Sequence, residues 1–263
     1  MENVYRRLGD RELHAYVFRP KSAAHNRERS AILLFHGGGW TEGSAEWVYE
    51  AARRFASRDM VAIPIEYRLA GGSVTPIESL ADVCAAFRWA RSHAKELELD
   101  PKRVAGYGVS AGAQLLASTV TVGCPGDDKQ SNPKPDAMLL LSPALDVGRD
   151  EWFRETLKGR AAPADYSPVE DVGSSSVPTS IVQGAEDTLT PLSGAQRYCE
   201  QVLKLKVRCE LNVFPNLGHL LTRNLKNQES DYDPDPEARK AGSLKQIEFL
   251  QDLGFIERES GKQ

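Results

Sequence analysis

The chain has 263 residues, of which 41% are hydrophobic and 27% are charged, with a formal net charge of −4 at pH 7. These values are ordinary for a soluble globular protein, and the length suits one large α/β domain, so we expect residues 1–263 to form a single domain. The negative charge argues against a nucleic-acid partner, which requires a basic surface. No apolar run reaches the roughly 18 residues of a membrane span, so we expect no membrane partner.

The N-terminal sequence and the cysteines are the features that bear on the cellular compartment of the protein. Residues 1–7 contain no apolar segment of the kind found in signal peptides, so we expect a cytoplasmic protein, or a secreted or periplasmic one if a leader was removed. No C-x-x-C spacing occurs, and we therefore read the cysteines as small buried side chains. A disulfide is geometrically feasible between Cys199 and Cys209, which lie near the end of a predicted helix and the start of the next strand. That bond would indicate an oxidising compartment. The cysteines are Cys84, Cys124, Cys199 and Cys209.

The predicted elements begin with a hairpin. Residues 3–8 and 12–18 alternate between polar and apolar side chains on either side of a Gly-Asp dipeptide, which is typical of a tight turn. A polar loop follows at 20–30, and short apolar runs then alternate with segments of helical periodicity. The predicted strands are 31–35, 60–65, 102–109, 137–141, 179–183 and 207–214. The predicted helices are 44–57, 76–95, 113–119, 191–205 and 237–253.

This alternation predicts the fold class. Parallel strands need crossover connections, so we expect an α/β protein with a mostly parallel central sheet, helices on both faces and the hairpin built around the same sheet. Three connecting segments carry no helical or strand pattern. They are a loop at 123–135, an irregular segment at 146–176 and a polar, acidic surface loop at 222–236.

The segment after the predicted strand 102–109 has the sequence G-x-S-x-G at residues 108–112. A strand before this motif and a helix after it indicate a nucleophile elbow, with Ser110 as the candidate nucleophile. The glycines are needed because the turn is strained and neighbouring Cβ atoms would crowd its backbone. So short a motif occurs by chance in about one chain in ten of this length. The assignment therefore depends on partners elsewhere in the chain.

A serine hydroxyl needs a base to remove its proton, and on this kind of fold the base comes last in the chain order Ser, Asp/Glu, His. His219 is the histidine that follows Ser110 in the sequence. It comes directly after the predicted strand 207–214, at the carboxyl end where the base must stand. We therefore expect His219 to be catalytic.

The acid that orients this base should follow the preceding strand, 179–183. Glu186 and Asp187 are both within reach there. We favour Asp187 because its shorter side chain suits a fixed turn, and Glu186 is the alternative. A structural role for Asp187 is to cap the helix that Pro191 opens.

A tetrahedral intermediate also needs backbone N–H groups directed at its oxyanion. Residues 36–40 read His-Gly-Gly-Gly-Trp and follow a predicted buried strand. Glycines let the amides approach a substrate without interference from side chains, so we expect Gly38, Gly39 and Ala111 to be the donors. We expect His36 to brace this loop, and we expect no metal and no cofactor.

Together, HGGGW at 36–40, GVSAG at 108–112, the 184–191 turn and Gly218-His219 resemble the α/β-hydrolase superfamily of carboxylesterases. Two branches are similar: the hormone-sensitive-lipase-like esterases, and the carbohydrate acetyl- and feruloyl-esterase-like hydrolases. The resemblance covers nearly the whole chain. It implies the α/β-hydrolase fold and a serine esterase that works through an acyl-enzyme intermediate.

These two branches differ in the cap, a helical lid over the active site. Lipase-like members carry this lid before the first strand. This chain begins almost directly with its hairpin, and 146–176 is short for a lid, so we expect a minimal cap or none. An open site suits a short, acetyl-type ester on a bulky alcohol such as a carbohydrate. Aromatic side chains could then serve as sugar platforms, and Trp40 is the strongest candidate. The others are Trp47, Tyr49 and Trp152.

Two other functions fit the same motifs. An oligopeptidase-like or lactone-cleaving hydrolase would use the same three residues, because amide and ester hydrolysis share this machinery. A non-catalytic binding protein on this fold is a further alternative, since fold does not fix function. It is disfavoured because no triad residue or oxyanion glycine is missing from the sequence.

Overall fold

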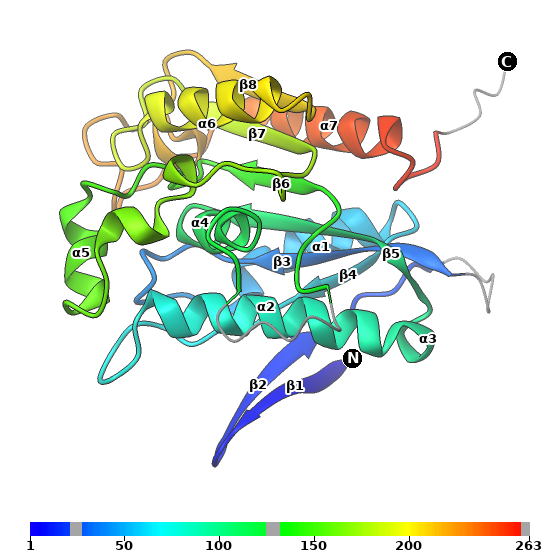
Figure 1. Cartoon of the computed structure of the whole chain (residues 1–263). Helices are drawn as coiled ribbons and strands as arrows, with labels where there is room; N and C mark the ends of the chain where they lie inside the picture. Colours follow the sequence, from blue (N-terminus) through cyan, green and yellow to red (C-terminus); the bar gives the residue numbers. More distant parts are fainter. Residues whose placement is uncertain (22–27, 125–131, 259–263) are drawn as a thin grey trace, which may run out of the picture.

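The computed structural model describes residues 1–21, 28–124 and 132–258. At its centre is a six-stranded, all-parallel sheet of order β4-β3-β5-β6-β7-β8 (Figure 1). The predicted α/β class is confirmed. Parts of the predicted loops 20–30 and 123–135 lie outside the described residues. The strands of this sheet are β3 (Arg29–Phe35), β4 (Val61–Pro64), β5 (Leu99–Val109), β6 (Met138–Leu141), β7 (Thr179–Gly184) and β8 (Cys209–Phe214).

The strands form where the sequence is continuously apolar, because both faces of the sheet are covered. All seven residues of β3 and all four of β6 are buried. The edge strand β4 ends at Pro64, which has no N–H to donate to a further ladder bond. β5 begins three residues earlier than predicted and is the longest strand, with 11 residues.

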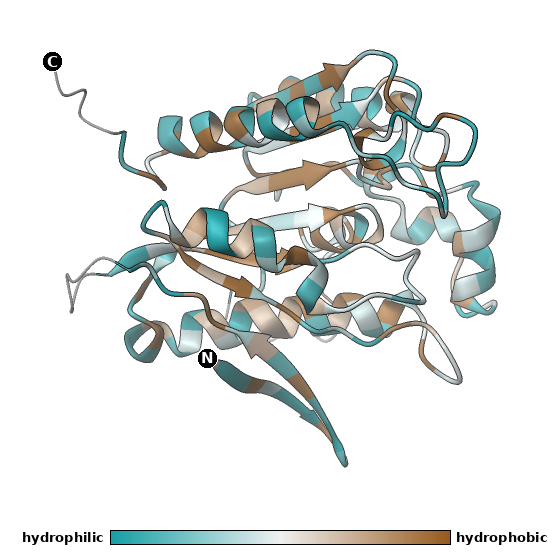
Figure 2. Cartoon of the chain, turned by 180° about the vertical axis from the view of Figure 1, so that it is seen from behind, coloured by the Kyte–Doolittle hydropathy of each residue, from teal (hydrophilic) through white to brown (hydrophobic). Residues whose placement is uncertain are grey.

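Helices cover both faces of the sheet, and each face has its own buried apolar cluster. Helices α2, α4 and α6 lie on the near face in Figure 1, and α1 and α7 lie on the face seen in Figure 2. None of the described helices is long and apolar enough to span a membrane. The helices are α1 (Tyr49–Ala56), α2 (Pro76–Ser92), the short α3 (Ala94–Leu97), α4 (Ala111–Ser118), α6 (Leu192–Lys204) and α7 (Pro236–Asp252).

The hairpin corrects the expectation that the whole chain is built around one sheet. Strands β1 (Glu2–Leu8) and β2 (Arg11–Tyr16) form a separate two-stranded antiparallel sheet. Two isolated antiparallel bridges connect it to the main sheet: Ala15 of β2 pairs with Ile65, just after β4, and Phe18, just after β2, pairs with Ala62 of β4. Beyond these bridges the hairpin projects away from the main sheet (Figure 1).

The segment 146–176 is also more regular than predicted. It contains the helix α5 (Glu151–Leu157) and two 3-10 turns, η2 (Pro163–Tyr166) and η3 (Pro168–Glu170). The Asp150 side chain caps α5 by accepting from the backbone N–H of Phe153 at 2.7 Å. A helix of seven residues is too short for its periodicity to be recognised, and Phe153 is held by burial in the core. The other 3-10 turns are η1 (Ala45–Val48) and η4 (His219–Leu221).

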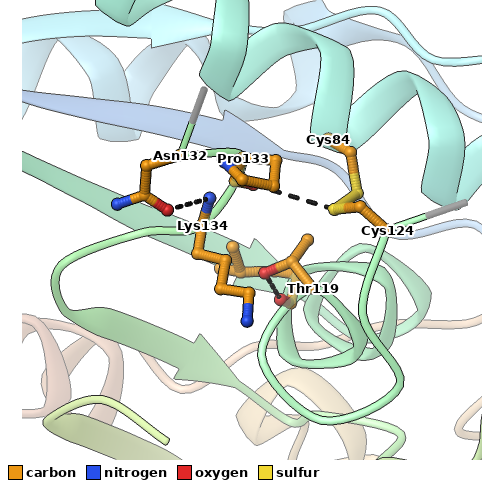
Figure 3. The surroundings of a disulfide bond; sticks show 7 residues. Cys84, Thr119, Cys124, Asn132, Pro133 and Lys134 are labelled. Atoms are coloured by element: carbon orange, nitrogen blue, oxygen red, sulfur yellow. Dashed lines mark hydrogen bonds between the residues drawn. A yellow bond between two sulfur atoms is a disulfide. The ribbon is translucent and has the colours of Figure 1, made fainter. Parts of the chain in front are cut away.

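The four cysteines form two disulfides, which corrects the interpretation of them as unbonded buried side chains. Cys199 in α6 bonds to Cys209 in β8, with their Cα atoms 5.4 Å apart. Cys84 in α2 bonds to Cys124, with a Cα separation of 5.9 Å (Figure 3). The second pair joins residues 40 positions apart, and it forms because α2 and the chain after α4 are neighbours on one face of the sheet.

Candidate active site

Ser110 lies between the end of β5 and the start of α4, with φ 51° and ψ −117°. This conformation is strained for a residue that carries a side chain. The residues on either side of this turn must be glycines, because a Cβ at either position would clash with neighbouring backbone atoms. A Cβ on Gly108 would lie 2.5 Å from the Cα of Ala113. One on Gly112 would lie 2.1 Å from the carbonyl oxygen of His36. The turn brings Ser110 to the wall of a cavity.

His219 lies in η4, just beyond β8, at the same edge of the sheet. Its Nε2 lies 3.0 Å from Ser110 Oγ, and the imidazole is buried. The backbone N–H of His219 donates to Gln228 Oε1 at 2.8 Å. The next amide, that of Leu220, donates to Ser142 Oγ at 3.0 Å. These contacts hold the turn that carries the ring.

Asp187 faces the other nitrogen of the imidazole. Its Oδ2 lies 2.9 Å from His219 Nδ1, and its Oδ1 lies 3.2 Å away. When the carboxylate accepts the Nδ1–H, Nε2 is left to accept a proton from a hydroxyl. The carboxylate also accepts from the backbone N–H groups of Leu189 and Thr190, from the Thr190 hydroxyl and from Gln183 Nε2. These donors fix it in one orientation.

The structure distinguishes between the two acidic candidates. Glu186 is exposed, and its backbone N–H donates to Leu217 O at 2.9 Å. Asp187 is the carboxylate that meets His219. Asp187 does not cap α6, because that helix begins at Leu192 with Pro191 as its N-cap residue.

The loop after β3 carries the three glycines predicted to supply amide donors. Gly38 and Gly39 have φ values of 110° and 54°, in the region that favours glycine. A Cβ on Gly38 would lie 2.2 Å from the carbonyl oxygen of Glu42, and one on Gly37 would lie 3.2 Å from the Cβ of Ser110. Neither the Gly38 nor the Gly39 amide donates to an acceptor in the described part of the chain. Both therefore remain available to a ligand.

Ala111 provides the third of these amides. It is the first residue of α4, and the first N–H groups of a helix have no partner within the helix. The three free amides come from two segments far apart in the sequence, the loop after β3 and the start of α4. The close approach of Gly37 to Ser110 brings these segments together.

His36 braces the glycine loop, as expected. Its ring stacks on Tyr67, with centroids 4.4 Å apart, and its Nδ1 lies 2.6 Å from Gly37 O. The Tyr67 hydroxyl donates to the carbonyl of His36 at 2.8 Å. Burial lowers the pKa of His36, which keeps the ring neutral in this apolar setting.

A cavity of about 1500 Å³ opens beside Ser110 and His219. Trp47 and Trp152 line it with 60% and 51% of their surface exposed. The indole N–H of Trp152 donates to Gly39 O at 3.0 Å, so this ring is fixed beside the glycine loop. Tyr49 packs edge-on against Tyr16 and is not among the residues that line the cavity.

Trp40 borders the cavity, but only 4% of it is exposed. Its indole N–H donates to Gln114 Oε1 at 2.9 Å, and its ring packs against Phe153 with centroids 4.7 Å apart. Little of the ring is therefore free to stack on a sugar, in contrast to the exposed rings of Trp47 and Trp152.

Gln228 is a site residue that the sequence did not reveal. It belongs to the segment 222–236, predicted to be a surface loop, yet it is only 4% exposed. Its Oε1 accepts from the amides of His219 and Thr188, and its Nε2 donates to Glu186 O at 2.9 Å. A single glutamine in a polar loop has no pattern that distinguishes it from its neighbours.

Residues 32–164 match the model of a protein family with the α/β-hydrolase fold. An arylesterase from Saccharolobus solfataricus is 35% identical over 115 residues, which cover 43% of this chain and 36% of that protein. Endo-1,4-β-xylanase B from Butyrivibrio fibrisolvens is 27% identical over 241 residues, 84% of this chain and 38% of that protein. The chain therefore spans little more than a third of the length of these relatives.

Among solved structures, the native esterase 2 of Thermogutta terrifontis is similar over 99% of this chain and 95% of its own, with 29% identity and a TM-score of 0.86. The same esterase has been solved with propionate bound and with butyrate bound. Its apo form is 31% identical, over 98% of this chain and 96% of its own.

Proposed function

Because the chain belongs to the α/β-hydrolase family, we propose that it is a serine carboxylesterase with Ser110, His219 and Asp187 as its catalytic residues. The observation that carries this proposal is one continuous hydrogen-bonded series. Ser110 Oγ lies 3.0 Å from His219 Nε2, and His219 Nδ1 lies 2.9 Å from Asp187 Oδ2. The esterases among its relatives and structural neighbours support the same activity.

In this mechanism His219 Nε2 takes the proton of Ser110 as Oγ attacks the ester carbonyl carbon. Asp187 holds the ring and stabilises the imidazolium that forms. The proton then passes from Nε2 to the departing alkoxide, which leaves an acyl-enzyme on Ser110. His219 then deprotonates a water molecule, which attacks the acyl carbon, and the proton passes from Nε2 to Ser110 Oγ as the acyl–Oγ bond breaks and the carboxylic acid leaves. His219 Nε2 transfers the proton in every step, and the hydrogen bond from Nδ1 to Asp187 holds the ring throughout.

The negative charge that develops on the carbonyl oxygen is stabilised by the free amides of Gly38, Gly39 and Ala111. Donors that are already fixed need no reorganisation when the charge appears, and removing one such donor typically costs about 10²- to 10³-fold in kcat. The left-handed backbone at Gly38 and Gly39 supports this role, because it keeps both amides out of local hydrogen bonds.

For the substrate, we propose a short acyl group, of acetyl type, on a carbohydrate alcohol. The propionate- and butyrate-bound forms of the similar esterase support a short acyl group. The xylanase relative and the exposed rings of Trp47 and Trp152 support a sugar on the alcohol side. Trp40 is proposed as part of the pocket wall.

Turnover of 4-nitrophenyl acetate, butyrate and octanoate tests the activity, with the wild type compared with Ser110→Ala. We expect the wild type to favour the short esters and the variant to lose at least about 10³-fold in kcat. Equal rates in the two proteins would contradict the mechanism. A peptide anilide and a lactone, offered in parallel, test the oligopeptidase-like and lactonase alternatives. Release of acetate from acetylated xylan tests the carbohydrate preference.

We also propose an oxidising compartment as the place of action. Both cysteine pairs are bonded in the structure, and disulfides persist mainly in such compartments. Thiol labelling of the protein denatured without reductant tests this. No labelled cysteine is expected when the protein is isolated from its native source, and four labelled cysteines would contradict the proposal.

A further inference from the structure

The cavity at Ser110 continues between α1 and α7, on the face of the sheet seen in Figure 2. Tyr107 and Val109 of β5 line it from below, since residues two apart on a strand point to the same face. Tyr107 precedes Ser110 by three residues, so at the rise of a strand it lies roughly 10 Å along β5 from the reacting serine. We call this extension of the cavity the basic arm. It is lined by Arg54, Arg58, Tyr107, Arg239 and Lys240.

Four cations line the basic arm. Arg54 and Arg58 come from α1 and the turn after it, and Arg239 and Lys240 are the fourth and fifth residues of α7. None of the four forms an ion pair with another described residue. Several other arginines are paired, as Arg68 with Asp82, Arg197 with Asp146, and Arg223 with Asp233.

No ion pair within the described residues therefore compensates the charge of the basic arm, although the Arg54 guanidinium lies 6.0 Å from the ring centroid of Phe55. The Nε of Arg54 is buried and has no hydrogen-bond partner. Arg239 makes one long contact, from Nη1 to the carbonyl of Leu220 at 3.5 Å. Glu50 of α1 is the acidic residue that lines this part of the cavity. Arg239 and Lys240 are exposed, so the buried donor that is costly to leave unpaired is the Nε of Arg54. An anionic ligand would pair with this donor and with the exposed cations beside it.

The acidic residues of the cavity mouth are grouped elsewhere. Glu42 and Glu229 both act electrostatically on Tyr232, which belongs to the segment before α7. The charged groups that act on the phenol of Tyr107 are instead Arg239, Arg54 and Glu50. Glu50 is thus the acidic side chain that lies with the cations of the basic arm, while Glu42 and Glu229 lie near Tyr232.

Tyr107 adds a neutral donor between the cations. Its ring is buried edge-on against Phe55, with centroids 5.8 Å apart. Its hydroxyl has no hydrogen-bond partner among the described residues. Burial raises the pKa of Tyr107, and the charges of Arg239 and Arg54 only partly oppose this shift. The phenol therefore stays protonated at neutral pH and can donate a hydrogen bond to an anion.

We propose that the basic arm binds a carboxylate, or an anion of similar shape, carried by the ester substrate at a distance from the reacting carbonyl. This inference rests on the proposed esterase function and narrows its substrate class. Arg54 and Arg239 face the anion from opposite helices, and Tyr107 donates from the strand between them. Guanidinium groups suit this role because their planar donors match a carboxylate.

The anion can belong to either half of the ester, and two substrate series separate these cases. For the acyl half, 4-nitrophenyl monoesters of dicarboxylic acids from succinate to sebacate are compared with 4-nitrophenyl alkanoates of equal length. For the alcohol half, acetates of ω-hydroxyalkanoic acids are compared with acetates of the matching alkanols. We expect the wild type to prefer the anionic member of one series, with an optimum at intermediate length.

Arg54→Gln, Arg239→Gln and Tyr107→Phe test the residues. Each arginine variant should lower the ratio of kcat/KM for anionic over neutral ester about tenfold, mainly through KM. Arg53→Gln is the matched control, because Arg53 lies on α1 over the rings of Phe18 and Tyr49 and away from the basic arm. It should retain the wild-type ratio.

Equal ratios in Arg54→Gln, Arg53→Gln and the wild type, in both substrate series, would overturn the inference while leaving the esterase function intact. If the wild type hydrolyses no ester of either kind, the proposed function fails, and calorimetric binding of free suberate then tests the basic arm alone. Binding that is lost in Arg54→Gln and kept in Arg53→Gln would support the basic arm. Absence of binding to the wild type would overturn it.

Discussion

Gln228 holds His219 in place from a segment that contributes no atom to the proposed reaction. Its Oε1 accepts the backbone N–H of His219 at 2.8 Å and that of Thr188 at 3.2 Å, and its Nε2 donates to Glu186 O. One buried amide thus joins the turn that carries the proposed base to the turn that carries its acid. The absence of a side chain on Gly218 makes room for it, since a Cβ there would lie 2.4 Å from Gln228 Cδ.

We therefore expect Gln228→Ala to lower kcat roughly 10- to 100-fold, because small displacements of catalytic groups have effects of this size. KM for 4-nitrophenyl acetate should change little. Lys226→Ala is the control, since Lys226 is an exposed residue of the same segment that contacts Asn224 through its backbone N–H. An unchanged kcat in Gln228→Ala would show that the two turns hold their positions without this bridge.

The choice of Asp187 over Glu186 is tested by Asp187→Asn. The amide can donate to His219 Nδ1, which would leave the proton on Nε2 and prevent it from accepting from Ser110. We expect kcat to fall about 10³- to 10⁴-fold. Glu186→Gln, at an exposed position, should stay within about twofold of the wild type. The reverse ranking of the two variants would identify Glu186 as the acid.

The glycine loop is tested by Gly38→Ala. The new Cβ would lie 2.2 Å from the carbonyl oxygen of Glu42, so the backbone must move and its amide with it. We expect kcat to fall about 100-fold. Gly71→Ala is the control, because its Cβ would meet nothing within 4 Å. If Gly38→Ala retains full activity, the Gly38 amide has no part in stabilising the oxyanion.

The disulfides should differ in their contribution to stability. Cys84 and Cys124 are separated by 40 positions and Cys199 and Cys209 by 10. The chain-entropy model then gives about 4 kcal/mol for the first pair and about 3 kcal/mol for the second. Urea unfolding of each double Cys→Ala variant measures these values. A free energy of unfolding equal to that of the wild type in both variants would mean that the bonds do not form.

Much of the fold could be predicted because its strands follow one simple pattern. Continuous apolar runs such as 137–141 are unambiguous when both faces of a sheet are buried, and all six predicted strands occur. The helix α5 was missed because it is short and is held by the burial of Phe153 rather than by periodicity. The separate hairpin sheet was not predicted, because a turn signal indicates that two strands pair with each other and does not indicate which sheet they join.

The sequence by itself determined the elements that must occupy fixed places in a motif: the glycines around Ser110, the glycine loop after β3, and a histidine after the last strand. Such residues are recognisable because backbone geometry allows few alternatives there. Tertiary structure alone decided which acid meets His219, that Cys84 bonds to Cys124, and that Trp40 is buried. It also brought Arg54 and Arg239, on helices at opposite ends of the chain, to one arm of the cavity. These contacts join segments that are distant in the sequence. They depend on how the elements pack in three dimensions, which local sequence patterns do not specify.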